Sequence, residues 1–134
     1  TASRPATQTA PAQARILLVE DDAGVRNATS MLFRSEGYEV AAVASSTEAF
    51  EQLGRDPGVD LLVTDYHLGD GANGSDVIAS VRERLGRPLK AVLMTGDTSS
   101  AIRRLPSDPH TRIANKPVNA DELLRLLREL LAGA

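Results

Sequence analysis

The sequence predicts an α/β fold, a doubly wound five-stranded parallel sheet with helices on both faces. Short runs of Val, Ile and Leu alternate with segments of helical period from residue 15 onward. Several of these runs are apolar at every position, which is typical of strands that are covered on both faces. Regular alternation of strands and helices favours right-handed crossovers, which make the strands parallel. The 134 residues fit one such domain.

The first strand is expected at residues 16–19, and the acidic residues that follow it mark its end. A helix is expected at 23–35, with Val25 and Phe33 on its inner face. Gly37 stands where a glycine commonly ends a helix. These elements form the first strand and helix of the alternation.

The second strand is expected at 39–43. The helix after it, at about 47–53, follows Ser45 and Ser46, either of which can cap its amino end. Gly54 is expected to end this helix.

The third strand, at 61–64, leads to a glycine-rich loop at 69–74. The helix after this loop has apolar residues at helical spacing from Val77 to Leu85, and Gly86 is expected to end it. The glycines of the loop are expected to serve backbone geometry, because no lysine of the phosphate-binding-loop type follows them.

The fourth and fifth strands are expected at 91–94 and 111–114, and the last helix at 121–131. Only a short fourth helix, at 99–105, fits between these two strands, because two prolines follow it closely.

The composition excludes several classes of protein and site. Residues 1–14 are rich in Ala, Thr, Pro and Gln, as in a flexible linker or tail, so the domain is expected at 15–132. The absence of cysteine excludes disulfides and thiolate metal sites. A net charge of −3 is not the positive charge that nucleic-acid binding requires. No apolar run reaches the roughly 20 residues of a membrane helix. We therefore expect a cytoplasmic domain that binds neither DNA by itself nor a membrane, with dimer formation left open.

Polar residues follow four of the predicted strands. Glu20 and Asp21 come after the first strand, Asp65 after the third, Thr95 after the fourth and Lys116 after the fifth. Parallel strands bring these positions to one edge of the sheet, where ligands of such folds bind. Carboxylates gathered there repel one another, and an all-oxygen set of ligands suits Mg²⁺. The ammonium and hydroxyl groups can meet further oxygens, so the edge is expected to hold Mg²⁺ and a phosphoryl group.

Four segments resemble the four motifs of response-regulator receiver domains, which have a flavodoxin-like fold. The segments are ILLVEDD, LLVTDYHL, VLMTGDT and NKPV, and they extend from Ile16 to Val118. The resemblance implies a domain of a two-component phosphorelay that accepts a phosphoryl group from a histidine kinase or a histidine phosphotransfer domain. It implies no enzyme with a separate substrate, because such a domain catalyses only its own phosphorylation and dephosphorylation.

The resemblance also implies the ligands of the ion. Asp65 would accept the phosphoryl group and share in binding Mg²⁺. Asp21 would bind the ion directly, Glu20 mainly through water, and His67 through its backbone carbonyl.

Two more residues would contact the phosphoryl group in such a domain. The hydroxyl of Thr95 would move toward a phosphoryl oxygen, and Lys116 would pair with the Asp65 carboxylate and then with its phosphate. Pro117 completes a Lys-Pro pair that often has a cis bond in this family.

Three positions depart from the receiver pattern. Position 69 is glycine where most receivers have proline, and Gly74 lies one residue farther from Asp65 than the matching glycine of most receivers. The longer loop is similar to that of receivers attached to hybrid sensor histidine kinases, which fits residues 1–14 as a linker. Ile113 stands where many receivers have an aromatic residue that rotates on activation, so this switch is not expected here.

Two other functions are weighed against the receiver. An aspartyl-phosphate phosphatase on a related fold would have a second aspartate two residues after its nucleophile, where this chain has His67. A phosphate-independent interaction module would keep the fold without the chemistry. Taken alone, the acidic residues after the first strand also fit a solvated turn, and Asp22 is expected to be a helix cap and not a ligand.

Overall fold

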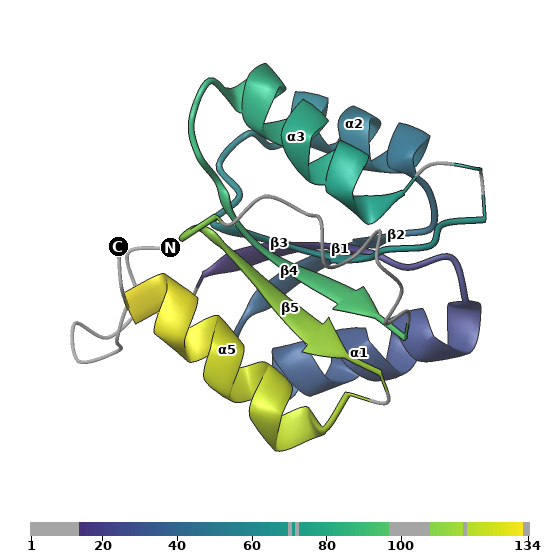
Figure 1. The fold of residues 1–134 in the computed structure, drawn as a ribbon, viewed down its shortest axis with the longest axis vertical. Coiled ribbons are helices and arrows are strands. Elements are labelled where there is room, and N and C mark those ends of the chain that lie inside the picture. The colour runs from purple at the N-terminus through teal and green to yellow at the C-terminus, as the bar shows by residue number, and fades with distance from the viewer. Residues whose placement is uncertain (1–13, 70, 72, 97–107, 117, 133–134) are drawn as a thin grey trace.

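A computed structural model describes residues 14–69, 71, 73–96, 108–116 and 118–132 of the chain. Five parallel strands form one sheet in the order β2-β1-β3-β4-β5 (Figure 1). The strands are β1 (Arg15–Val19), β2 (Glu39–Val43), β3 (Leu61–Asp65), β4 (Lys90–Thr95) and β5 (Thr111–Asn115). The predicted strands are therefore confirmed, each within one residue at either end.

Helices cover both faces of this sheet, as predicted. In the described part of the chain they are α1 (Ala23–Ser35), α2 (Ser46–Arg55), α3 (Gly74–Leu85) and α5 (Ala120–Ala132). Figure 1 shows α1 and α5 on one face and α2 and α3 on the other. The short helix predicted at 99–105 lies outside the described residues. Among the residues that the structure describes, no helix is both long enough and apolar enough to cross a membrane.

The core lies in two layers because side chains alternate along each strand. On β1, Ile16 and Leu18 pack with Phe33 of α1 and the leucines of α5. Leu17 and Val19 point to the other face, where α2 and α3 cover them. All four strand residues are at most 1% exposed, and each such side chain stabilises the fold by ~1.5–3 kcal/mol.

The helices test three sequence predictions, two of them at helix ends. Asp22 caps α1 as predicted, because its carboxylate accepts a hydrogen bond from the backbone N–H of Val25 at 3.0 Å. The prediction that Gly54 ends α2 is wrong, since the helix continues to Arg55. Gly54 is exposed and tolerates a helical backbone at a cost of about 1 kcal/mol relative to alanine. The inner position predicted for Val25 is also wrong, because 43% of this residue is exposed.

Arg82 on α3 joins the start of β5 to the helix. Its guanidinium donates hydrogen bonds to the Leu89 carbonyl at 2.8 Å, to the His110 carbonyl at 3.2 Å and to the Thr111 hydroxyl at 2.9 Å. It also forms an ion pair with Asp108. Asp108 accepts two more hydrogen bonds, from the backbone N–H of His110 and from the hydroxyl of Thr111, both at 2.8 Å. The cluster fixes where β5 begins.

The cluster around Asp108 should make the free energy of unfolding depend on pH. Burial raises the pKa of Asp108, but the donors from His110, Thr111 and Arg82 outweigh it and lower the pKa from 3.8 to about 2. A depressed pKa stabilises the native state above pH 3.8, and this contribution is lost as the pH falls toward 2. We expect it to reach about 1–2 kcal/mol after allowance for solvent screening. In urea titrations, the stability advantage of the wild type over Asp108→Asn should shrink across this window, and an unchanged advantage would contradict the assignment.

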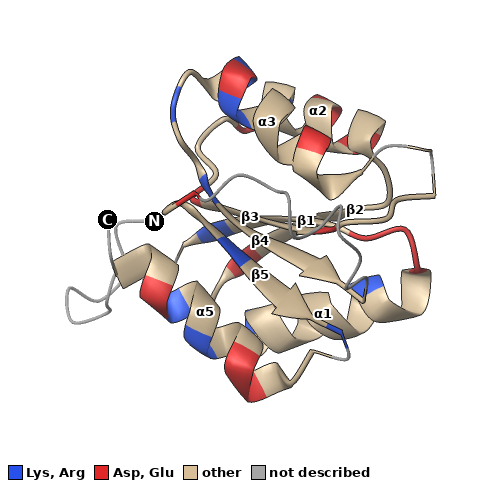
Figure 2. Cartoon of the chain, in the orientation of Figure 1, with Lys and Arg blue, Asp and Glu red and all other residues tan. Residues whose placement is uncertain are grey.

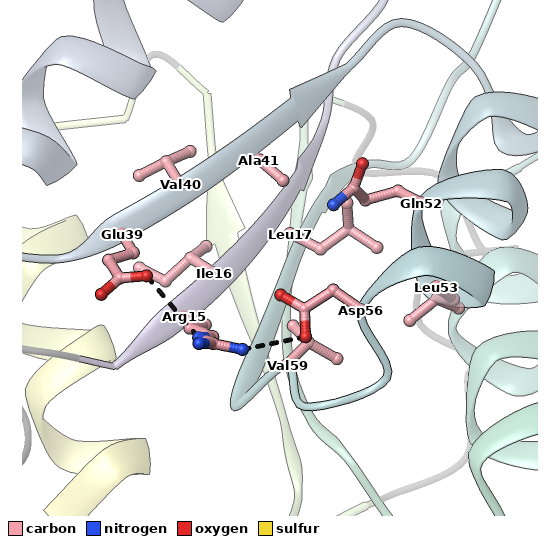
Figure 3. Close-up of a pocket in the computed structure, with 10 residues that line it drawn as sticks. All are labelled: Arg15, Ile16, Leu17, Glu39, Val40, Ala41, Gln52, Leu53, Asp56 and Val59. Carbon is pink, nitrogen blue, oxygen red and sulfur yellow. Dashed lines mark hydrogen bonds and ion pairs between the residues drawn. The ribbon is translucent and has the colours of Figure 1, made fainter. Parts of the chain in front are cut away.

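A half-open pocket of about 160 Å³ lies at the amino ends of β1 and β2, beside α2. Figure 3 shows Arg15 at its mouth, pairing with Asp56 at 2.9 Å and with Glu39 at 3.6 Å. These side chains are about half exposed, so the pairs add little stability. Ligands of doubly wound sheets bind at the opposite, carboxyl edge. The pocket is therefore remote from the predicted site.

Candidate functional site

Three carboxylates meet at the carboxyl edge of the sheet. Glu20 and Asp21 follow β1, and Asp65 is the last residue of β3. One side-chain oxygen from each lies within 4.8 Å of the others. Glu20 and Asp65 are buried, at 1% and 6% exposed, whereas Asp21 is exposed. Figure 2 shows the acidic segment between β1 and the amino end of α1 as a continuous red stretch.

Lys116 and Thr95 complete the arrangement predicted from the strand ends. The Lys116 ammonium lies 2.9 Å from Asp65 Oδ2 and donates a hydrogen bond to it. The backbone N–H of Lys116 donates to the Thr95 carbonyl at 2.8 Å, which ties the end of β5 to the end of β4. Thr95 is fully buried and follows Met94, the residue that pairs with Asp65 across the sheet.

The turn that carries the acidic pair is held from α1. The Arg26 guanidinium donates to the backbone carbonyl of Glu20 at 2.8 Å and to that of Asp21 at 3.4 Å. The backbone N–H of Asp22 donates to Glu20 Oε2 at 3.2 Å. Arg26 was not predicted as part of the site, because nothing in the sequence separates it from the many other arginines. Its contacts fix the backbone from which both carboxylates project.

The second carboxylate oxygen of Glu20 supports a metal site. Oε1 is buried and has no hydrogen-bond donor among the residues that the structure describes. Burial raises the pKa of Glu20, the Asp22 N–H lowers it and the Asp65 carboxylate raises it, so the net shift is upward. The Asp21 carboxyl group is close enough to share a proton with Glu20, but it offers none when both are ionised. An all-oxygen set with an unpaired buried oxygen fits a hard divalent cation such as Mg²⁺.

Glu20→Gln should make the domain more stable than the wild type without Mg²⁺ and less stable than the wild type with Mg²⁺. Because the native state raises the pKa of Glu20, the stability that protonated Glu20 contributes is present below pH 4.5 and lost as the pH rises through the shifted value. Near neutral pH without metal, the glutamine variant should therefore be more stable than the wild type, by about 1 kcal/mol. With Mg²⁺ the wild type should gain more stability than the variant, because binding favours the folded state and the variant keeps only the Asp21 and Asp65 carboxylates of the cluster. Thermal melts with chelator and with Mg²⁺ would test this, and a variant destabilised in both would contradict it.

The loop after β3 carries His67, whose backbone carbonyl was predicted to bind the ion. His67 pairs with Asn73 through an isolated antiparallel bridge, and the backbone N–H of Gly74 donates to the Tyr66 carbonyl at 2.7 Å. The His67 side chain is exposed, and its ring packs edge-on against Tyr66 with the centroids 4.8 Å apart. The carbonyl role of His67 stays a prediction. Pro117 lies outside the described residues.

An apolar groove of about 730 Å³ borders the cluster, between α1 and the segment that leads into α5. Glu20 and Lys116 of the cluster are among the residues that line it. The other residues that line it are Val25, Ala28, Thr29, Leu32, Met94, Val118, Ala120 and Leu123. The exposed side of Val25, which the sequence prediction placed in the core, faces this groove.

Comparison with known proteins identifies sequences that are related to this chain. The chain matches the response regulator receiver domain family over residues 16–128. It is 29% identical over 118 residues to the two-component response regulator ORR5 of Oryza sativa subsp. japonica, with 87% of each chain covered. It is 32% identical over 117 residues to the DNA-binding response regulator MtrA of Mycobacterium tuberculosis, and covers 50% of that protein. The chain thus spans about half the length of MtrA.

Solved structures show the same fold. A response regulator receiver protein from Sinorhizobium medicae superposes with a TM-score of 0.79 at 25% identity, covering 90% of this chain and 95% of that one. The receiver domain from the hybrid histidine kinase CckA superposes with a TM-score of 0.74 at 26% identity, covering 88% and 99% of the two chains.

Proposed function

Because the chain belongs to the response regulator receiver domain family, we propose that Asp65 accepts a phosphoryl group from a phosphohistidine of a histidine kinase or a histidine phosphotransfer domain. Receiver domains of two-component systems interact with such proteins. One observation carries the assignment to Asp65: its buried carboxylate pairs with the Lys116 ammonium at 2.9 Å while lying among the oxygens of Glu20 and Asp21. The domain is a signalling module and not an enzyme that turns over a separate substrate.

The proposed transfer needs no general base. Asp65 is nucleophilic as a carboxylate, so the bond between phosphorus and the donor nitrogen breaks as a bond to an Asp65 oxygen forms. Lys116 stabilises negative charge on the phosphoryl oxygens, and the Thr95 hydroxyl donates to one of them. Glu20, Asp21 and Asp65, with the His67 carbonyl, would hold Mg²⁺, which supplies neutralisation of charge in a loose transition state when bound.

The groove beside the cluster supports a protein donor. It is lined largely by apolar side chains of α1 and the start of α5, and Glu20 and Lys116 also line it. A donor helix that lays an apolar face along this groove would bring its histidine to Asp65. We propose this as the approach of the phosphodonor.

The wider context is also a proposal. We propose that the domain is cytoplasmic and belongs to a hybrid sensor histidine kinase, supported by the likeness to the CckA receiver and by the linker composition of residues 1–14. The net charge of −3 supports a domain that does not bind nucleic acid by itself. A kinase core encoded upstream in the same reading frame is expected, and a DNA-binding domain encoded downstream would contradict this context.

Phosphorylation by a small donor tests the function. Incubation with acetyl phosphate and Mg²⁺ should add one phosphoryl group per chain, seen as a single adduct in the intact mass spectrum. Chelator should prevent the addition, and hydroxylamine should remove the adduct because it cleaves acyl phosphates. A chain that stays unmodified while a known receiver is modified beside it would favour the phosphate-independent module. Turnover of phosphate monoesters would favour the phosphatase.

A further inference from the structure

Arg26 joins helix α1 to the turn that carries Glu20 and Asp21. Its guanidinium nitrogen Nη1 donates a hydrogen bond to the Glu20 carbonyl at 2.8 Å and to the Asp21 carbonyl at 3.4 Å. Its backbone N–H donates to the Asp22 carbonyl at 2.8 Å. Arg26 therefore bonds the backbone of three successive residues, and its side-chain bonds do not occupy the carboxylate oxygens that would bind an ion.

The turn has a physical reason to open when no ion is bound. Oxygens of Glu20, Asp21 and Asp65 lie within 4.8 Å of one another, and ionised carboxylates at such distances repel. Asp65 belongs to β3 and is held by the sheet, whereas Asp21 is exposed and lies outside the strands and helices. Movement of the turn is the easiest relief of this repulsion, and the bonds from Arg26 oppose that movement.

The charge of Arg26 and its hydrogen bonds should affect a cation in opposite ways. A guanidinium beside the pocket repels Mg²⁺, so removal of its charge alone should tighten binding. Removal of its bonds should weaken binding, because a turn that is closed only part of the time lowers the apparent affinity in proportion to its closed fraction. The sign of the change in the dissociation constant therefore distinguishes the two effects.

We propose that Arg26 is a positioning residue that keeps the acidic turn closed in the metal-free domain and thereby sets the affinity of the site for Mg²⁺. This inference rests on the proposed function of the cluster. In this role Arg26 contacts neither the ion nor the phosphoryl group. It determines how much Mg²⁺ the domain needs and not how fast the phosphoryl group is transferred once the ion is bound.

Arg26→Met tests the proposal, because methionine is also a long, unbranched side chain but has no donor. We expect its dissociation constant for Mg²⁺ to rise about tenfold, as for a turn that is closed about one tenth of the time. The backbone N–H of Glu20 donates to the Val43 carbonyl at 3.0 Å, and in the metal-free variant it should exchange with solvent about tenfold faster than in the wild type. Amide chemical-shift titration and hydrogen exchange of the whole chain measure these changes.

Arg34→Met is the matched control. Arg34 lies on the same helix, and its guanidinium donates to the Val40 carbonyl at 3.1 Å, near the amino end of β2 and away from the cluster. The control loses the same charge and a bond of the same kind, but its Mg²⁺ affinity should stay within about twofold of the wild type, since salt screens remote charges. Arg26→Lys keeps the charge and a donor, so it should bind Mg²⁺ more tightly than Arg26→Met.

The rate of phosphorylation separates a positioning role from a catalytic one. With acetyl phosphate as donor, Arg26→Met should need about tenfold more Mg²⁺ for its half-maximal rate. At saturating Mg²⁺ it should reach nearly the wild-type rate, because the occupied site holds the turn closed. A rate at saturation far below that of the wild type would overturn the proposal, since Arg26 would then act on the phosphoryl group itself.

Two binding results would also overturn the proposal. They are unchanged or tighter Mg²⁺ binding in Arg26→Met, and equal weakening by Arg26→Met and Arg34→Met. Should Arg26→Met not fold, Arg26→Gln replaces it under the same criteria. If the wild type is phosphorylated with Mg²⁺ and Arg26→Met binds the ion normally, only this inference fails. If the wild type binds no Mg²⁺ and is not phosphorylated, the proposed function fails with it.

Discussion

Asp65→Asn is expected to abolish phosphorylation from both small and protein donors, by at least about 10³-fold in rate. The amide has the shape of the carboxylate but neither its charge nor its nucleophilicity, so no acyl phosphate forms. The fold should survive, because the change removes repulsion with Glu20 while it weakens the ion pair with Lys116, which is 36% exposed. The measurement is the fraction of phosphorylated chain over time by intact mass spectrometry, with circular dichroism as the test of folding.

The acidic turn offers a matched control for this variant. Asp22→Asn changes the same residue type beside the cluster, and asparagine caps a helix as well as aspartate does. It should be phosphorylated at nearly the wild-type rate. If both variants lose phosphorylation equally, general loss of negative charge explains the result and the nucleophile is not identified.

Gly74→Ala should be the most destabilising of the small substitutions considered. A Cβ atom at position 74 would lie 2.3 Å from the backbone carbonyl oxygen of Asp65 and 2.7 Å from Leu93 Cδ1. Gly74 is buried, and its N–H donates to the Tyr66 carbonyl at 2.7 Å, so the start of α3 cannot move away without losing this bond. We expect a loss of about 3 kcal/mol, or roughly 10 °C in melting temperature.

Urea titration of Gly74→Ala and Gly54→Ala would test the steric origin of this loss. Gly54 lies in α2 with open space around it, and alanine there should stabilise the domain by up to about 1 kcal/mol. Opposite signs for the two variants are expected. A Gly74→Ala chain as stable as the wild type would mean that α3 can shift freely, and the position of Asp65 would then not depend on it.

Local pattern predicted most of the elements because it agrees with the tertiary structure. Strand β1 is apolar at four consecutive positions, and both faces are buried as expected. Gly37 and Gly86 have positive φ angles of 93° and 70°, as helix-ending glycines do. The end of α2 was missed because Gly54 is exposed, and a glycine at an exposed helical position costs only about 1 kcal/mol. Val25 was misplaced because the groove beside α1 depends on α5, which is far away in the sequence.

The members of the cluster could be predicted, but their packing could not. Strand ends of a parallel sheet meet at one edge, which brought Glu20, Asp21, Asp65 and Lys116 together before any coordinates were known. The contact between Arg26 and the acidic turn depends on a rotamer. For Gly74, the lack of a side chain matters more than the backbone freedom expected from the sequence, because a Cβ atom there would clash with the Asp65 backbone carbonyl.

Chemical mapping of the phosphorylated residue tests the central claim most directly. Borohydride reduces an aspartyl phosphate to homoserine. Peptides of the reduced protein should therefore carry homoserine at position 65, whereas positions 21 and 22 should remain aspartate. Homoserine at position 21, or a stable phosphate on His67, would contradict the claim that the pocket formed by Glu20, Asp21, Asp65 and Lys116 directs the phosphoryl group to Asp65.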